Sequence, residues 1–296
     1  MSRLDPTLDL VFRLLLTRQT DLLEDMLEGI LARPIRDLEL RPSDIPGRRP
    51  DDKRVILDVH VECDDGSRTD VEMQTQTPAN LASRLTYYAT RTHADQLNRG
   101  DEYRLLAPTT VVAWLKEPLF DHLHAFHNVF RMREDESNVL LTDHLSVHVL
   151  QLSRFGPFAS MSRNATVNRW ARFFLARTDA EFDRLASEDP IMQLAKDTLE
   201  QLSTDPDTLR LIRAREDEIK LYRMELHQVR TEGEAKGEAK GEAKAKARVL
   251  LDLLGRRFGP LPGSVRDRIE AATLEQLDAW IGRILSAETV EQVLAS

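Results

Sequence analysis

The stretches Val55-Ile-Leu-Asp-Val-His-Val-Glu62 and Thr69-Asp-Val-Glu-Met-Gln74 decide the fold. Both alternate apolar with polar side chains, which is the two-residue period of a strand that buries one face. Asp64-Asp65-Gly66, between them, is typical of a tight turn. The sequence therefore predicts a β-hairpin with one apolar face (Val55, Leu57, Val59, Val61, Val71, Met73) and one mostly acidic face (Ile56, Asp58, His60, Glu62, Asp70, Glu72, Gln74).

The register of this hairpin follows from its two faces, because residues opposite one another project to the same side of a sheet. A two-residue loop would place Asp58 against Met73 and mix the faces. A three-residue loop with Gly66 in the left-handed conformation keeps them apart and places Asp58 opposite Glu72, with Cβ atoms roughly 5 Å apart. Two carboxylates this close repel each other unless a cation or a proton lies between them.

Asp58 and Glu72 have the chemistry of a divalent-cation site. Hard cations such as Mg2+ prefer carboxylate and carbonyl oxygens, and the backbone carbonyl of Met73 is a third candidate ligand. Such an ion activates water and neutralises charge that develops on a phosphoryl group. We expect Gln74 to orient that water. The competing interpretation is that the acidic residues form the solvated face of an antiparallel sheet.

The flanking sequence predicts the other elements. Apolar residues at three- and four-residue spacing indicate a helix over 5–31, and a Pro-, Gly- and Asp-rich stretch over 42–52 indicates a loop. Alternating strands and helices followed by helices alone favour an α/β class with a helical C-terminal extension. We expect a helix at about 79–98, strands at about 110–115, 126–132 and 144–152, and helices from 167 onward.

The C-terminal part has features of its own. A short, imperfect coiled-coil seam is formed by Ile212, Arg215, Ile219, Tyr222, Leu226 and Val229. Three copies of Gly-Glu-Ala-Lys from 233 to 244 place like charges four residues apart and repeat a glycine, so we expect a marginal helix that frays readily. A small helical unit follows from about Arg248, with a turn at Gly259-Pro-Leu-Pro-Gly263 and an amphipathic stretch through Leu277, Ile281, Ile284 and Leu285.

Length and composition limit the class of protein. The chain has 296 residues, of which 41% are hydrophobic, and its 12 Gly and 13 Pro exclude collagen-like and wholly disordered classes. A single cysteine, Cys63, excludes a disulfide framework and favours a reducing compartment. We find no secretory leader and no apolar run near the ~20 residues that cross a bilayer, so we expect a cytoplasmic protein without a membrane segment.

The net charge of -9 argues against a general affinity for nucleic acid. Residues 1–150 hold 18 basic and 26 acidic side chains, whereas residues 151–296 hold 23 and 24. The acidity is thus concentrated in the half that contains the hairpin, where a metal site would account for part of it.

The pattern Asp58…Glu72-x-Gln74 resembles the metal site of the PD-(D/E)XK nuclease superfamily. It is most similar to the branch of recombination-promoting nucleases and transposases, in which glutamine commonly replaces the usual lysine. The resemblance covers about residues 4–175, and Leu254-x-x-Arg257-Phe-Gly-Pro-Leu261 is similar to a small domain of unknown function that often follows. Further matches, in order, are Asp9-x-x-Phe12-Arg13, Arg84-x-x-Tyr87-Tyr88, Gln96-x-x-x-Gly100-x-x-Tyr103 ahead of Pro108, Leu141-Thr-Asp143 and His148-x-x-x-Leu152.

The resemblance implies a restriction-endonuclease-like core and a metal-dependent endonuclease that hydrolyses phosphodiester bonds of DNA. It implies Mg2+ or Mn2+ bound by Asp58, Glu72 and the Met73 carbonyl, with Gln74 as the third catalytic residue. It also implies a role in recombination, mobile elements or defence against foreign DNA. We expect a nuclease-like domain at 1–175, a helical extension at 176–232, a repeat linker at 233–247 and a small helical domain at 248–296.

The helix after the hairpin supplies candidate phosphate ligands. Arg84, Tyr88 and Arg91 share one helical face, whereas Tyr87 would point toward the core. Arg84 could instead serve as the partner of Glu72.

Other acids and a histidine are secondary candidates. Asp9 would either bind metal or stabilise the first helix near its N-terminus. His60 shares the acidic face and could modulate the site. Three further acids of the first helical region could reach the metal, namely Glu24, Asp25 and Glu28.

Two other functions stay open at this point. The first is a catalytically silent interaction protein that oligomerises through the seam and the C-terminal domain; a homo-oligomer would also suit two-strand cleavage. The second is a zinc-dependent hydrolase built on His122-x-His124-x-x-His127, although this motif lacks cysteine partners.

Overall fold

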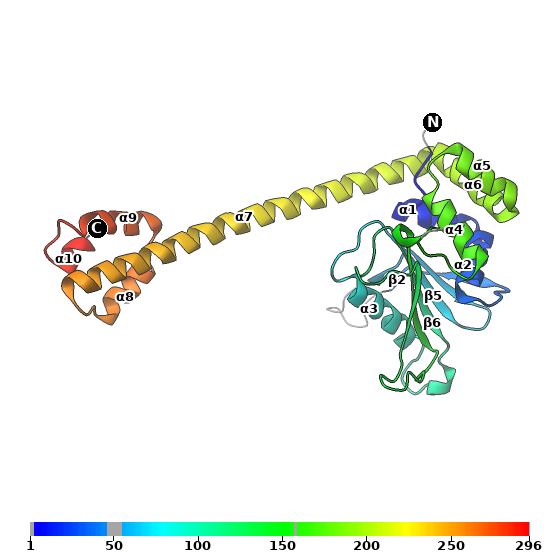
Figure 1. Ribbon diagram of the computed structural model, residues 1–296, viewed down its shortest axis with the longest axis horizontal. Helices are drawn as coiled ribbons and strands as arrows, with labels where there is room; N and C mark the ends of the chain where they lie inside the picture. The colour runs from blue at the N-terminus through cyan, green and yellow to red at the C-terminus, as the bar shows by residue number, and fades with distance from the viewer. Residues whose placement is uncertain (1–2, 46–54, 157–158, 296) are drawn as a thin grey trace. The chain divides into compact units, whose positions relative to one another are not determined.

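The computed structural model describes residues 3–45, 55–156 and 159–295. The chain divides into two compact units, Met1–Arg213 and Ala214–Ser296. The first contains a six-stranded mixed sheet flanked by helices, which confirms the predicted α/β class (Figure 1). No helix in the described parts of the chain is both long and apolar enough to cross a membrane.

The predicted hairpin forms the second and third strands of the six-stranded sheet. Val59 lies opposite Val71 and His60 opposite Asp70, and Gly66 has φ +78°, so the three-residue loop and its register are confirmed. The sheet order is β1-β4-β5-β6-β8-β7, with β5, β6 and β8 parallel. Its strands are β1 (Leu38–Arg41), β4 (Val59–Cys63), β5 (Arg68–Gln74), β6 (Thr109–Leu115), β7 (His127–Arg131) and β8 (Leu145–Gln151).

The first strand of the hairpin is shorter than predicted. Val55–Ile56 forms β3, which pairs with β2 (Asp44–Ile45) in a separate two-stranded sheet. The Leu57 N–H bonds to the Ser43 carbonyl at 2.8 Å, so the backbone bends at Asp58 before β4 begins. Of the predicted loop over 42–52, residues 46–52 lie outside the described residues.

The apolar face of the hairpin packs on N-terminal helices. Val59, Val61, Val71 and Met73 join the main core with α1 (Asp9–Arg18), α2 (Thr20–Leu31) and α4 (Ala165–Leu175). The single helix predicted over 5–31 is wrong in one respect. Extended backbone at Gln19 (φ -133°, ψ 92°) separates α1 from α2 and lets each helix bury its own apolar stripe.

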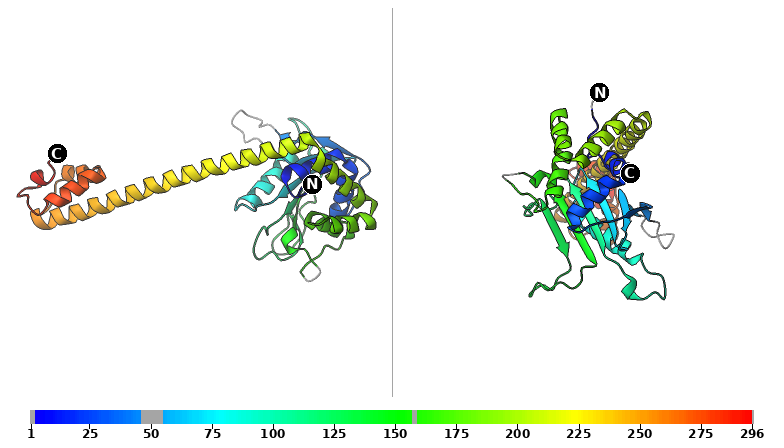
Figure 2. Two further views of the ribbon diagram at one scale, coloured as in Figure 1. Left: turned by 90° about the horizontal axis from the view of Figure 1, so that it is seen from above. Right: turned by 90° about the vertical axis from the view of Figure 1, so that its right-hand side faces the viewer.

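The opposite face of the sheet carries α3 (Leu81–Ala94), as Figures 1 and 2 show. Leu81, Leu85 and Ala89 pack against apolar residues of β6 and β8. The polar face of β4 and β5 therefore lies beside α3. Tyr87 is 37% exposed, so its predicted place in the core is wrong.

Helices complete the first unit, as predicted from 167 onward. A capping box of Thr178 and Glu181 begins α5, and Asp189 caps α6 through the Ile191 N–H. The elements are the short 3-10 turns η1 (Tyr103–Leu105) and η2 (Leu152–Arg154), then α5 (Asp179–Glu188), α6 (Pro190–Thr204) and the start of α7 (Pro206–Phe258).

The second unit has a small core of its own. Leu250 and Leu254 of α7 pack with residues of α8 (Gly263–Glu270), α9 (Leu274–Arg283) and α10 (Val290–Val293). Of the predicted amphipathic stretch, Leu277 and Ile284 are buried, but Leu285 is 87% exposed. The Gly-Glu-Ala-Lys repeat lies within continuous helix α7.

Gly29 of α2 marks a close approach of two helices. A Cβ at this position would lie 2.8 Å from Thr166 Cγ2 of α4. We expect Gly29→Ala to lower the free energy of unfolding by about 1–3 kcal/mol, because α2 and α4 must separate. The matched control is Gly282→Ala in α9, where the Cβ meets open space; this change should be neutral or slightly stabilising. Chemical denaturation of both variants tests this, and equal stabilities would contradict it.

Candidate functional site

The bend before β4 brings Asp58 and Glu72 together. The hairpin register would place Leu57 opposite Met73, but the Met73 N–H bonds instead to Asp58 Oδ2 at 2.9 Å. The Asp58 N–H donates to Glu72 Oε1 at 3.2 Å. Each carboxylate therefore accepts a backbone N–H from the segment that carries the other, which holds the two side chains next to each other.

Gln74 and the Met73 peptide complete this edge of β5. Gln74 Nε2 donates to Glu72 Oε2 at 3.0 Å. In an extended strand the N–H and C=O of one residue leave on the same side. Since the Met73 N–H points to Asp58, its carbonyl is directed to the same edge as the carboxylates.

The acidic face is buried rather than solvated. Glu72 is 2% exposed and Asp70 is fully buried. Burial, with a smaller contribution from the nearby charge of Asp9, raises the pKa of Asp58 to about 6, against the hydrogen bond from Met73. Burial also raises the pKa of Glu72 well above its usual value, with the charge of Asp58 as the next cause. Neither the buried Glu72 nor the half-buried Asp58 forms an ion pair with a described residue, so a bound cation would stabilise the charged form of both.

Helix α1 contributes two charges to the site. Asp9 raises the pKa of Asp58 and Arg13 lowers it, so both side chains lie within electrostatic reach. Asp9 Oδ1 also accepts a hydrogen bond from the Leu10 N–H at 2.8 Å. Both alternatives for Asp9, helix stabilisation and a place beside the metal, therefore fit the structure. Arg13 belongs to the motif Asp9-x-x-Phe12-Arg13, but no role was predicted for it from the sequence, although its four-residue spacing from Asp9 puts both on one helical face.

Helix α3 brings Arg84 and Tyr88 to the carboxylates. The Arg84 charge lowers the pKa values of Asp58 and Glu72, yet it forms no ion pair with any described residue within 4.0 Å. Its Nε is buried and has no hydrogen-bond acceptor among the described residues. The guanidinium lies 5.8 Å from the ring centroid of Tyr88. Arg91, by contrast, is paired with Asp95 Oδ2 at 2.9 Å.

A buried polar network lies behind the carboxylate pair. His60 Nδ1 and Asp70 Oδ1 are 2.5 Å apart, and the Thr92 hydroxyl donates to Asp70 Oδ2 at 2.7 Å. The network joins β4, β5 and α3. Sequence reasoning placed His60 on this face but missed Thr92, since nothing in the sequence shows which side of α3 faces Asp70.

The residues present fit a hard divalent cation. The set consists of the buried Glu72, the half-buried Asp58, the directed Met73 carbonyl and the buried Nε of Arg84, which has no acceptor among the described residues. A cation and a phosphate oxygen would be complementary to it. Within the described ranges, no three His, Cys, Asp or Glu side chains cluster as metal ligands. A cation here would therefore need backbone and water oxygens beside Asp58 and Glu72.

The zinc interpretation of His122, His124 and His127 is wrong. The His127 ring in β7 points to His148 of β8, with Nε2 3.1 Å from Nδ1, whereas His122 stacks on Phe120 in the preceding loop. The helix acids are also engaged elsewhere. Asp25 bonds to Arg169 and Trp170, and Glu28 accepts from the Ile35 N–H, while Glu24 lies among other acids of that region.

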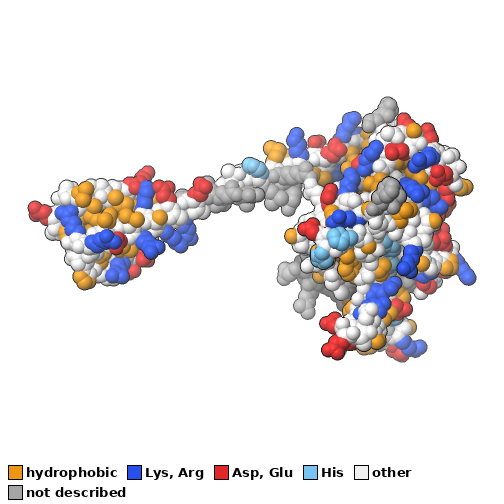
Figure 3. All heavy atoms as spheres, viewed as in Figure 1, with side chains coloured by type: hydrophobic (Ala, Val, Ile, Leu, Met, Phe, Trp, Pro, Cys, Tyr) orange, Lys and Arg blue, Asp and Glu red, His pale blue; other side chains and the backbone are white. Residues whose placement is uncertain are grey.

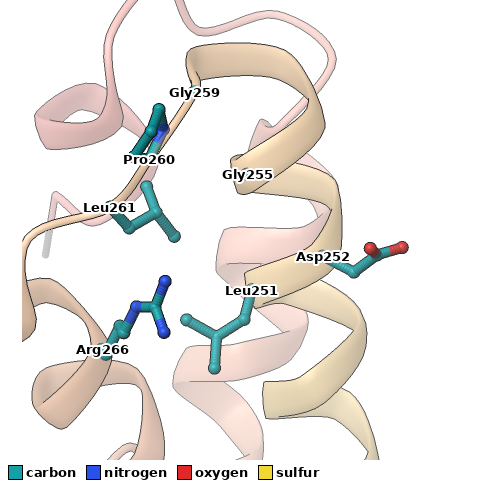
Figure 4. A pocket seen from close by; sticks show the side chains of 7 residues that line it. All are labelled: Leu251, Asp252, Gly255, Gly259, Pro260, Leu261 and Arg266. Carbon is teal, nitrogen blue, oxygen red and sulfur yellow. The ribbon is translucent and has the colours of Figure 1, made fainter.

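A pocket of about 550 Å³ lies in the second unit. Figure 4 shows Leu251, Leu261 and Arg266 around it, with Asp252 pointing away. Its lining brings no two acids and no nucleophile together. The carboxylate pair of the first unit is therefore the candidate active site.

A comparison with known protein families supports the assignment of this site. No curated protein and no solved structure matched the chain. The sequence model of one family, described as PD-(D/E)XK nuclease family transposase, matches residues 6–228 and so includes the sheet, α3 and every residue of the carboxylate site. Because this match spans well over half of its length, the chain belongs to the PD-(D/E)XK nuclease family transposases.

Proposed function

We propose that this protein is a Mg2+- or Mn2+-dependent DNA endonuclease. The proposal is carried by one observation: the buried Glu72 and the half-buried Asp58 lie next to each other, and neither forms an ion pair within 4.0 Å with any residue that the structure describes. Family membership supplies the reaction class, namely phosphodiester hydrolysis. Cleavage of both strands is simplest in a dimer, so we include a homo-oligomer in the proposal.

Each residue then has a distinct role. Asp58, Glu72 and the Met73 carbonyl would hold the cation, which supplies charge neutralisation and an activated water. The Gln74 amide, fixed by its bond to Glu72, orients the attacking water. Arg84 directs its buried Nε–H to a phosphate oxygen, and Tyr88 beneath it limits the positions of the guanidinium.

Because the net charge of the chain is -9, its attraction to DNA must come from individual arginines near the site and not from its overall charge. On the face in Figure 3, basic and acidic side chains of the first unit are interspersed. We therefore expect weak binding without divalent metal, and an affinity that falls with salt in proportion to the few phosphates that the arginines contact.

The test is incubation of the purified full chain with supercoiled plasmid and Mg2+ or Mn2+, with and without chelator. The proposal predicts nicked and linear DNA only when free divalent metal is present. Intact plasmid under both metals, together with no metal-dependent rise in melting temperature, would instead favour the silent interaction protein.

Arg84→Ala should lower the cleavage rate by about 10²- to 10³-fold, because a donor aimed at developing phosphate charge is removed. Arg84→Lys should retain part of the activity through its charge. The matched change is Arg91→Ala on the same helix, which should cost less than about tenfold because Arg91 is held by Asp95. Single-turnover cleavage rates of the variants test this prediction. Equal losses of rate for Arg84→Ala and Arg91→Ala would refute the assignment of Arg84 as the phosphate ligand.

A further inference from the structure

The loop over 116–125 begins beside the candidate site. Gln74 of β5 and Leu115 of β6 are in register, and the Lys116 N–H bonds to the Gln74 carbonyl at 3.0 Å. The Thr77 hydroxyl, in the segment that leads to α3, donates to the Glu117 carbonyl at 3.2 Å. The loop therefore leaves the carboxyl edge of the parallel strands, where α/β proteins commonly bind ligands.

This loop is held from inside by Gln151 at the end of β8. Gln151 is fully buried and accepts a hydrogen bond from the Leu119 N–H at 2.8 Å. Its amide donates to the carbonyls of Leu123 at 3.1 Å and Ala125 at 2.8 Å. Leu119 also packs against the apolar cluster under α3. These contacts hold the loop on both sides of residues 120–122, which form its outer turn.

The outer turn presents two aromatic rings to solvent. Phe120 is 39% exposed and stacks on the exposed His122, with centroids 5.6 Å apart and ring planes 12° apart. Arg154 Nη2 donates to the intervening Asp121 carbonyl at 3.2 Å, which places a guanidinium beside the rings. A flat aromatic surface next to a positive charge is complementary to a nucleobase and its phosphate.

We propose that Phe120 and His122 form a stacking platform for an unpaired base of the DNA substrate. The inference rests on the proposed nuclease function and narrows its substrate class. A base within a duplex has both faces covered by its neighbours, so only an unpaired base offers a face to the platform. The preferred substrate is thus DNA with an unpaired base near the scissile phosphate, which a supercoiled plasmid offers where it is locally unwound.

Binding in chelator at low salt tests the platform separately from cleavage. The probes are a 20-nucleotide oligo-dT with one central 2-aminopurine and the corresponding duplex. We expect the wild-type protein to prefer the single strand and to quench the 2-aminopurine. The double change Phe120→Ala and His122→Ala should weaken single-strand binding by about five- to a hundredfold and abolish the additional quenching.

Two variants make this result specific. Phe120→Trp should retain the affinity and the quenching. Phe130→Ala removes an equally exposed phenylalanine on β7 (40%) and should leave both unchanged. The platform is overturned if the wild type binds neither probe, binds the duplex as tightly, or is matched by the double variant. None of these outcomes bears on metal-dependent plasmid cleavage, whose failure would be seen in that assay alone.

Discussion

Asp58→Ala should reduce plasmid cleavage by at least about 10³-fold while the protein stays folded. The change removes one of two carboxylates that would hold the cation, so neither water activation nor charge neutralisation remains. The fold should survive, because the main core lies on the other face of the sheet. Cleavage rates and circular dichroism of the same preparation give both results.

The matched control is Asp64→Ala. Asp64 is an exposed acid of the same hairpin, in its turn, and removing it changes the net charge by the same amount. Its activity should equal that of the wild type. Equal cleavage by Asp58→Ala and wild type would remove Asp58 from the active site.

Asp58→Asn should raise the stability of the metal-free protein at pH 7.5. The pKa of Asp58 in the folded state, about 6, is above its ordinary value of 3.8, so the folded state binds the proton more tightly. The resulting stability is present below about pH 4 and is lost as the pH rises through about 6. At about 1.36 kcal/mol per pKa unit, ionisation of Asp58 lowers the free energy of unfolding by on the order of 3 kcal/mol. Asn carries no charge and avoids this loss, and its side-chain oxygen still accepts a hydrogen bond from the Met73 N–H.

Thermal melts at pH 4 and pH 7.5 in chelator test this sign. The variant should melt higher than wild type at pH 7.5, and the difference should shrink at pH 4. Adding Mn2+ at pH 7.5 should raise the melting temperature of wild type but not that of the variant. A wild type that melts higher than Asp58→Asn in chelator at pH 7.5 would contradict the account.

The hairpin could be predicted because its alternation of apolar and polar residues is compatible with only one strand register. Alternation fixed the two faces, and separate faces required an odd loop, which Gly66 provides with its positive φ. That register also placed Asp58 beside Glu72, as the structure does, although a bend at Asp58 rather than strand pairing brings the two together. The family motifs then indicated the restriction-endonuclease-like class that the six-stranded sheet confirms.

Features that depend on tertiary contacts could not be predicted from the sequence. The bend at Asp58 arises from the Leu57 bond to Ser43, a partner fourteen residues away. Which of Arg84 and Arg91 is engaged in an ion pair depends on where each side chain meets an acid, and Arg91 meets Asp95. The burial of Asp70 with His60 and Thr92 likewise follows from the packing of α3, which strand alternation does not specify.

The most direct measurement is the affinity of the full chain for Mn2+, with free Mn2+ quantified by electron paramagnetic resonance. It is made on wild type, Asp58→Ala and Asp64→Ala. We expect at least one bound Mn2+ per chain for wild type and Asp64→Ala, and an affinity at least about tenfold weaker for Asp58→Ala. Equal Mn2+ binding by all three proteins would contradict the claim that Asp58 and Glu72 form the metal centre.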